Sequence, residues 1–533
     1  MNRLLTAVVA AAALWAAACS SGGGSTITPP PPAGNFSLAS LKGQYAFVTS
    51  GEVFTGGLSA TPMSRVGIFT ADGQGRISGG VEDVNTAGTP SGAISIMGGN
   101  YTVNPDGRGT LTLTFGQTSS ISFGIILTST STPAIDGLMI DETSNSSQAS
   151  TGSGNFIKQV AGPLAVSDVA GTYVFDFAGF DGNANPESFI GEFTANSGVI
   201  STGLFDDNDN FSPSSGPMTL GTIAQDSLNA STLPNFGRGV ATIAGQQFVF
   251  YIVDSSRVRF LSTSAGMLSG DAVLQGNSIP ASLSTINSSF AFLVAGGSGN
   301  GGLTRVGRFT ASGSTLSKML MDVNDAATEI QFNNLSNGSI TAYDGTTGRG
   351  TLSFQDSNGQ TYSFVFYLNS ATAGVIQDVS PSNTAGLVRV VADGSILGQS
   401  GSPFSSSNIS GTYAMNWSGL VVAGGSFPIQ DEEDLLAQVK VTNLSLSGTS
   451  DLFQFTSATL TPIFDVGTAG QITFNSGNGS GDDGKRVDMD VNLSKTSPIH
   501  MVVYIVRPQL AFFANRDNNG AQRIVAGILE AQQ

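Results

Sequence analysis

Apolar and polar residues alternate with a period of two along most of the chain after residue 36, as expected for β-strands with one buried face. In the segment that begins at Gly171, for example, Tyr173, Phe175 and Phe177 share one face. Turn-forming pairs such as Asp-Gly, Asn-Gly and Ser-Gly separate these segments. The best candidate for a helix is one or two turns at 431–438, DEEDLLAQ. The pattern therefore predicts an all-β protein.

The alternating pattern itself occurs four times. Each copy opens on an aromatic residue with glycine six residues later, and closes on glycine with glutamine five residues later. The opening pairs are Tyr45/Gly51, Tyr173/Gly179, Phe290/Gly296 and Tyr413/Gly419, and the closing pairs are Gly154/Gln159, Gly270/Gln275, Gly394/Gln399 and Gly527/Gln532. Several landmarks in a fixed order indicate tandem copies of one module.

The landmarks divide the chain into a leader and four modules. We expect β-modules at 37–160, 166–277, 283–400 and 406–533, joined by short linkers that contain Pro163, Pro280 and Pro403. Each module is long enough to bury its own core. In the third copy the pattern gives about eight strands, at 289–295, 303–311, 314–323, 337–343, 350–355, 361–369, 373–378 and 385–392. Eight short antiparallel strands predict a meander barrel, with a β-sandwich as the alternative.

The first 36 residues have the composition of an export signal and a tether. Arg3 precedes the uncharged, largely apolar segment 4–18, which is short for a membrane span and ends in small residues. Residues 16–19, Ala-Ala-Ala-Cys, resemble the lipobox of bacterial lipoproteins, and Cys19 is the only cysteine of the chain. The resemblance implies a signal peptide at 1–18 and a lipidated Cys19, followed by a Gly/Ser/Pro tether at 19–36. An ordinary signal sequence with an incidental cysteine is the alternative.

The amino-acid composition excludes several kinds of site and partner. Without a second cysteine the mature chain has no disulfide and no thiolate metal site, and a single histidine, His500, cannot supply a catalytic triad to each of four modules. A net charge of −17 argues against nucleic acid as a partner. We find no catalytic constellation and expect a non-enzymatic protein without a cofactor.

The modules resemble known β-proteins in two ways. The aromatic opening strand and the glycine-punctuated meander are similar in organisation to avidin and lipocalin barrels, without carrying over any pocket residue. The repeat set resembles uncharacterised bacterial lipoproteins with tandem glycine-rich β-repeats, which brings no activity with it. Together with Cys19, this implies a lipid-anchored protein of the cell envelope, at the outer membrane or cell surface.

Two charged motifs recur in three of the copies. A D-x-N motif ends the third strand, with Asp83/Asn85, Asp206/Asn208 and Asp322/Asn324, and a GRG turn carries Arg108, Arg238 and Arg349. The fourth copy has GKR from residue 484 and no recognisable D-x-N. An Asp on the apolar side of a strand end needs a charged partner, so we predict ion pairs within each module: Asp83 with Arg108, Asp206 with Arg238, and Asp322 with Arg349. An Asx turn at the Asp, and an anion site at the Arg, are the alternatives.

Two acidic segments are weak calcium candidates. The run DDNDN places Asp206, Asn208 and Asn210 in the spacing that begins a calcium loop, but the glycine and the distal glutamate of that loop are missing. DEED at 431–434 is the other cluster. A solvated acidic loop is the alternative interpretation of both.

Three functions stay open. The first is a non-enzymatic envelope lipoprotein that acts as a structural, adhesive or binding array for an unknown surface ligand or protein. The second is a small-ligand binder with a pocket inside each calycin-like barrel. The third is a hydrolase that uses paired carboxylates. A sealed module core would favour the first, and an open cavity of several hundred Å³ the second.

Overall fold

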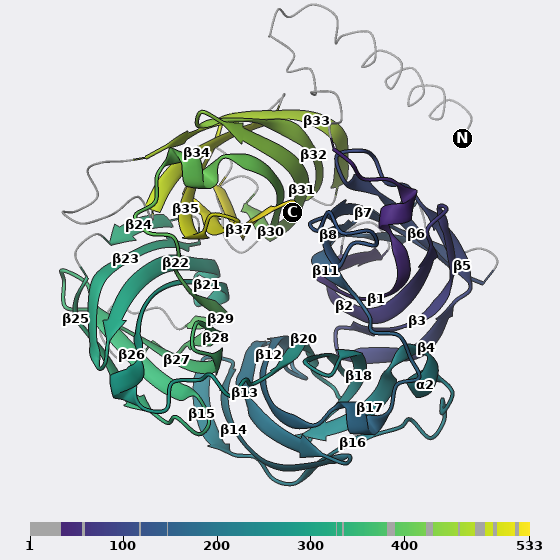
Figure 1. Cartoon of the computed structure of the whole chain (residues 1–533), viewed down its shortest axis with the longest axis horizontal. Coiled ribbons are helices and arrows are strands. Elements are labelled where there is room, and N and C mark those ends of the chain that lie inside the picture. The colour runs from purple at the N-terminus through teal and green to yellow at the C-terminus, as the bar shows by residue number, and fades with distance from the viewer. Residues whose placement is uncertain are drawn as a thin grey trace, which may run out of the picture.

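The computed structural model describes residues 34–55, 59–116, 119–145, 148–326, 328–332, 335–380, 390–422, 430–456, 459–474, 486–493, 498–516 and 522–533. The expected signal peptide, Cys19 and nearly all of the tether lie outside these ranges. Among the described residues, no helix is long and apolar enough to cross a membrane. The protein consists of four β-barrels in chain order (Figure 1).

Strands account for nearly all regular structure in barrels 1 and 2. Barrel 1 contains η2 (Leu38–Ser40), β1 (Lys42–Thr55), β2 (Ser59–Asp72), β3 (Arg76–Thr86), β4 (Thr89–Ile96), β5 (Gly98–Tyr101), β6 (Arg108–Phe115), β7 (Ser119–Leu127), β8 (Asp136–Asp141), β9 (Ser144–Asn145), β10 (Gln148–Ser150) and β11 (Ser153–Lys158). Barrel 2 contains η3 (Val166–Asp168), β12 (Gly171–Phe180), β13 (Pro186–Asn196), β14 (Val199–Asp209), β15 (Ser212–Pro217), β16 (Gly221–Ala224), α2 (Thr232–Phe236), β17 (Arg238–Ile243), β18 (Gln246–Asp254), β19 (Arg257–Ser262) and β20 (Met267–Leu274).

Barrels 3 and 4 each consist of one short 3-10 helix followed by strands. Barrel 3 contains η4 (Leu283–Thr285), β21 (Asn287–Ser298), β22 (Gly301–Ser312), β23 (Thr315–Asp325), β24 (Thr328–Phe332), β25 (Ser336–Tyr343), β26 (Arg349–Gln355), β27 (Thr361–Ser370), β28 (Ala373–Asp378) and β29 (Val390–Gly398). Barrel 4 contains η5 (Ser406–Ile409), β30 (Gly411–Val422), β31 (Gln430–Thr442), β32 (Ser445–Thr456), β33 (Thr459–Thr473), β34 (Arg486–Leu493), β35 (Ile499–Arg507), β36 (Leu510–Asn515) and β37 (Gln522–Ala531).

Each barrel closes as an antiparallel meander. In barrel 4 the strands β30 to β37 pair in sequence order and β37 returns to β30. Barrels 1 to 3 close in the same way through the pairs β1–β11, β12–β20 and β21–β29. Outside the eight-strand cycle, β4, β15 and β24 pair with the C-terminal halves of β3, β14 and β23. The prediction of an eight-stranded meander barrel is confirmed, and the sandwich alternative is wrong.

The acidic segment at 431–438, which was the best candidate for a helix, lies instead within strand β31. This strand pairs with β30 along one edge and with β32 along the other. Because both edges of the strand are paired, tertiary contacts override the local helix preference of the Glu, Leu and Ala residues.

Every barrel interior is filled by one cluster of buried apolar side chains. In barrel 2, for instance, Phe175, Phe177 and Phe260 lie in the core, and the Phe177 and Phe260 ring centroids are 5.2 Å apart. Barrel 4 centres on Trp417, which is fully buried. The alternation read from the opening strands therefore separates residues of the barrel core from residues of the outer wall.

The four barrels lie in a ring around a central opening, with barrel 4 beside barrel 1 (Figure 1). We use the name hub for the inner surface of this ring, formed by the opening and closing strands β1, β11, β12, β20, β21, β29, β30 and β37. We number the junctions by the barrels that they join, so that 4/1 is the closing junction. Apolar clusters from the outer walls fill each junction: Val81 and Tyr251 meet at 1/2, and Leu436 and Ile126 meet at 4/1.

Candidate functional site

Junction 1/2 is held by a buried side-chain triad. Arg238 of β17 donates from Nε and Nη2 to both carboxylate oxygens of Asp83 of β3, at 2.7 and 2.9 Å. The hydroxyl of Tyr251, which lies opposite Arg238 on β18, donates to the same carboxylate at 2.5 Å. Burial, together with the Asp83 charge, holds the pKa of Tyr251 well above its usual value, so the phenol keeps the proton that it donates.

The same triad recurs at the next two junctions. At 2/3, Arg349 donates to Asp206 at 2.7 and 2.6 Å and Tyr367 donates at 2.6 Å. At 3/4, Arg486 donates to Asp322 at 2.9 and 2.7 Å and Tyr504 donates at 2.5 Å. A two-pronged contact between Arg and carboxylate fixes orientation as well as distance. The GKR of the fourth copy therefore supplies Arg486, the counterpart of the GRG arginines.

The predicted pairing within a module is wrong, because each Asp pairs with the Arg of the following barrel. The reason is a β-bulge in the hairpin before the Asp, where the register between β2 and β3 shifts at Thr70/Ala71. Ile77 points into the barrel core, but the bulge reverses the alternation, so Val81 and Asp83 lie on the outer wall. The Asx-turn alternative is also wrong, since all three Asp residues lie inside strands.

Amide side chains clamp each junction beside the triads. Asn85, Asn208 and Asn324, the asparagines of the D-x-N motifs, donate to backbone carbonyls of the next barrel, at 2.9 Å in the contact between Asn85 and Ser262. The closing glutamines do the same: Gln159, Gln275, Gln399 and Gln532 donate to the carbonyls of Ile252, Leu368, Ile505 and Leu127. Both motifs therefore tie one barrel to the next.

The closing junction has the same plan with different residues. Arg108 of barrel 1 contacts Asp451 of barrel 4 at 2.9 Å, and also Asp465. Asp451 pairs with Leu436 across the strands, as Asp322 pairs with Val306, so it is the missing Asp of the fourth copy. Ile126 lies opposite Arg108, in the place of the tyrosine. Junction 4/1 therefore keeps the ion pair but lacks the phenol.

The segment of barrel 4 that is equivalent to D-x-N could not be recognised in the sequence, for two reasons. The β31–β32 pairing has no bulge, so the sequence from the core residue Leu446 to Asp451 is one residue shorter than from Ile77 to Asp83. The position of the asparagine holds Phe453. Register, which only the structure shows, makes the two segments equivalent.

Junction 4/1 also buries acids of β31. Glu432 accepts a hydrogen bond from Thr151 of barrel 1. Burial, followed by the neighbouring Asp434 and Glu52, raises the pKa of Glu432 well above its usual value. Burial also raises the pKa of Asp434 to about 7. Glu432 and Asp434 of the DEED segment are thus packed against barrel 1, and Glu433 is buried against Arg523 of its own barrel, so these three acids do not lie in a solvated loop.

The calcium candidates belong to junction 2/3. Asp206 is occupied by Arg349 and Tyr367, while Asn208 donates to the carbonyls of Asp378 and Val390. Asn210 follows the last residue of β14 with a positive φ of 46°. Across the described part of the chain, no three His, Cys, Asp or Glu residues are grouped to hold a metal.

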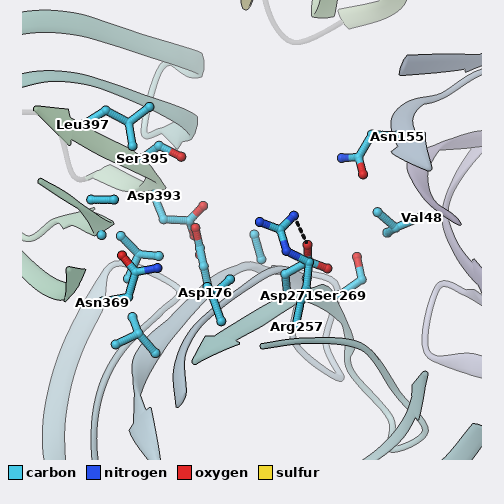
Figure 2. A pocket seen from close by; sticks show the side chains of 17 residues that line it. Val48, Asn155, Asp176, Arg257, Ser269, Asp271, Asn369, Asp393, Ser395 and Leu397 are labelled. Atoms are coloured by element: carbon cyan, nitrogen blue, oxygen red, sulfur yellow. Dashed lines mark hydrogen bonds and ion pairs between the residues drawn. The ribbon is translucent and has the colours of Figure 1, made fainter. Parts of the chain in front are cut away.

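Two adjoining pockets lie among barrels 1 to 4, outside the barrel cores. The hub pocket, of about 460 Å³, has a mixed lining of small apolar and polar residues, and its charged residues are Asp176, Arg257, Asp271 and Asp393 (Figure 2). The apolar pocket, of about 490 Å³, is lined mainly by glycines and by Phe180, Pro186, Phe211 and Leu420. Ala178 and Asp393 line both pockets, so the two spaces meet at these residues.

Asp176 of β12 and Asp393 of β29 form an acid pair at junction 2/3. Figure 2 shows their carboxyl groups side by side, apart from the Arg257–Asp271 ion pair. Burial, and then the charges of Asp393 and Asp271, raise the pKa of Asp176 well above its usual value, and burial raises the pKa of Asp393 to about 6. Sequence reasoning missed this pair because its members lie in different modules and neither belongs to a repeated motif.

Comparison with known proteins yields no family. No family model and no curated protein matches the sequence. Among solved structures, the chain is similar to transferrin binding protein B from serogroup B Neisseria meningitidis, with 11% identity, 75% of this chain and 85% of that chain covered, and a TM-score of 0.19. It is also similar to a mutant of the same protein from Haemophilus parasuis Hp5, with 10% identity, coverage of 94% and 98%, and a TM-score of 0.20. Scores this low support no transfer of ligand or mechanism.

Proposed function

We propose that this chain is a non-enzymatic, lipid-anchored envelope protein whose four barrels form one rigid ring that binds its ligand or partner between barrels. The observation that carries the proposal is the recurrence of one junction at all four boundaries, including the one between the last and the first barrel. Its Arg–Asp contacts are bidentate at three junctions, and the arginine is buried at every junction except 2/3, where the Arg349 side chain is 25% exposed. Barrels joined only by flexible linkers would not need such complementary contact surfaces.

The filled barrel interiors direct binding to the spaces between barrels. Each core is a continuous apolar cluster, whereas the hub pocket and the apolar pocket lie where barrels meet. The repeated Asp residues face Arg, and Tyr at three junctions, so they do not form the acid–base pair of a hydrolase. Anchoring at the outer membrane or cell surface rests on the leader sequence and Cys19.

Small-angle X-ray scattering of the mature chain tests the ring. A compact arrangement of about 500 residues gives a radius of gyration of roughly 23–27 Å, whereas four barrels in an extended string give roughly 35–40 Å. We expect the compact value, and a larger one for a chain in which Arg238 and Arg349 are both replaced by Glu. Replacement of the half-exposed Arg257 by Glu is the matched control and should leave the radius unchanged. A wild-type radius near that of the string would disprove the ring.

A further inference from the structure

Junction 2/3 differs from the other three at one pair of hub positions. At each junction, the third residue after the opening aromatic lies near the sixth residue before the closing glutamine of the next barrel. These positions hold Val48 and Ser269 at 1/2, Asp176 and Asp393 at 2/3, Leu293 and Ala526 at 3/4, and Asn416 and Ser153 at 4/1. Asn416 and Ser153 satisfy each other through a hydrogen bond of 2.9 Å. Only junction 2/3 places two groups of like charge at these positions. Their mutual repulsion destabilises the contact, so a purely structural role does not explain the pair.

The acid pair has no cation of its own in the described structure. Arg257, the arginine among the residues that line the hub pocket, contacts Asp271 at 3.3 Å. Arg349, the arginine of this junction, is bonded to Asp206. The buried Oδ1 of Asp176 accepts no hydrogen bond. Burial raises the pKa of both carboxyls, and the charge of Asp393 raises that of Asp176 further. The pair therefore retains a proton near neutral pH, and a bound cation would displace it.

An apolar cavity opens next to these carboxyls. Asp393 lines both pockets, and beyond it the apolar pocket is bounded by Phe180, Pro186 and Phe211. Its volume of about 490 Å³ lies within the usual range for small-molecule sites, which combine apolar walls with a few placed polar groups. The ionisable groups that line this pocket are both acids: Asp393 itself and Glu187, whose pKa is raised to about 7 by burial. Ser298 is the other polar residue of the lining, and its hydroxyl donates to Asp325.

We propose that the two pockets together bind an amphipathic organic cation, with its ammonium group at Asp176 and Asp393 and its apolar body in the apolar pocket. Charge complementarity selects a cation, and the apolar walls select a hydrocarbon body over a metal ion. The inference deepens the proposed function, since it names the ligand class of one space between barrels and therefore rests on that function.

Gly297 offers a way to fill the site without disturbing the fold. It lies on β21 and lines the apolar pocket. A Cβ atom at this position would meet no heavy atom closer than 3.9 Å, and one of its nearest neighbours is Pro186 of the pocket wall. Leucine at 297 should therefore occupy the pocket. Gly216 on β15 provides a matched control, because its Cβ would lie 3.6 Å from the Phe205 ring and it lines neither pocket.

Isothermal titration of the mature chain with n-octylammonium, 1-octanol and octanoate tests the proposal. We expect one octylammonium per chain, octanol at least tenfold weaker, and no octanoate binding. Titrations in buffers of different ionisation enthalpy should show proton release when octylammonium binds, because the shared proton leaves the acid pair. Titrating groups around the site are Asp176, Asp271, Asp393 and Glu187, with Arg257 as the fixed positive charge.

Four single-residue variants test whether the ligand binds at this site. Asp393→Asn, and separately Asp176→Asn, should weaken octylammonium at least tenfold and leave octanol unchanged. Gly297→Leu should abolish both, whereas Gly216→Leu should bind as wild type. Equal affinity for octylammonium and octanol, or unchanged binding to Gly297→Leu, would overturn the proposal. If octylammonium fails to bind a chain that scatters as a compact ring, this inference fails alone; an extended chain would refute the ring itself.

Discussion

Removing Arg238 should open junction 1/2 more than removing Asp83 does. The Arg238 and Asp83 side chains are only 5% and 3% exposed, so breaking their contact leaves a buried charge without its partner. Arg238 keeps a second acceptor, since its Nη1 lies 2.6 Å from Asp226. When Arg238 is removed, Asp83 and Asp226 each lose the charged donor that contacts them.

The magnitudes follow from this asymmetry. Breaking a buried ion pair by removing one partner costs about 3–5 kcal/mol, and we expect Arg238→Gln to lie in that range. For Asp83→Asn we expect about 2–3 kcal/mol, because Asn still accepts from Tyr251 and from the Ala93 amide while Asp226 still balances Arg238. The two changes together should cost less than their sum, with a coupling of about 2 kcal/mol.

Amide hydrogen exchange along β3 and β17 of the mature chain measures the opening free energy. A second double-mutant cycle, Asp83→Asn with Arg108→Gln, is the control, since these residues lie at different junctions and should act additively. A cost below about 1 kcal/mol for Arg238→Gln, or equal coupling in the two cycles, would refute the assignment of Asp83 to the neighbouring barrel.

Three further predictions concern the anchor, the linkers and the buried acid Asp434. Mass spectrometry of the mature protein should find an acylated amino-terminal Cys19, and an unmodified terminus downstream of it would contradict the lipid anchor. Limited proteolysis should cut first in the three linkers, yet the nicked protein should elute from a sizing column as one species because the junctions hold it; separated barrels would contradict the ring. The pKa of Asp434 is raised to about 7, so its contribution to stability is complete below about pH 4 and is lost as the pH rises through 7. Amide exchange in β31 should therefore quicken between pH 5 and 8 in wild type, and less so in Asp434→Asn, whereas an identical profile would rule out this carboxyl as the cause.

The barrel fold was predictable because its signals are local. Core residues such as Tyr173 and Phe175 alternate within one strand, and glycines recur where the opening and closing strands approach closely. A Cβ at Gly270, for example, would lie 1.8 Å from the carbonyl oxygen of Asp176. Such constraints repeat in every copy and are visible in a single sequence.

The ring was not predictable in the same way, because its determinants depend on register. The motifs that carry it, D-x-N, GRG and the closing glutamine, were recognised as recurrent, but a one-residue bulge decides which wall Asp83 faces. One signal was available: the run FVFYIVD from Phe248 lacks alternation because both of its faces are buried, one in the barrel and one against its neighbour. The Asp176–Asp393 pair left no trace of this kind.

The junction also bears on how such a chain arises. Barrels 2 and 3 each carry a complete acceptor face, with Asp206 or Asp322, and a complete donor face, with Arg238 or Arg349. A solitary barrel with both faces would bind copies of itself head to tail, and a fixed angle between neighbours closes such an assembly into a cycle. If the gene for such a barrel were duplicated and four copies were fused, the resulting chain would keep the same cyclic arrangement of barrels. Once fused, the fourth contact is formed within one molecule at high effective concentration, so it tolerates a weaker interface, and Ile126 stands where its three counterparts keep tyrosine.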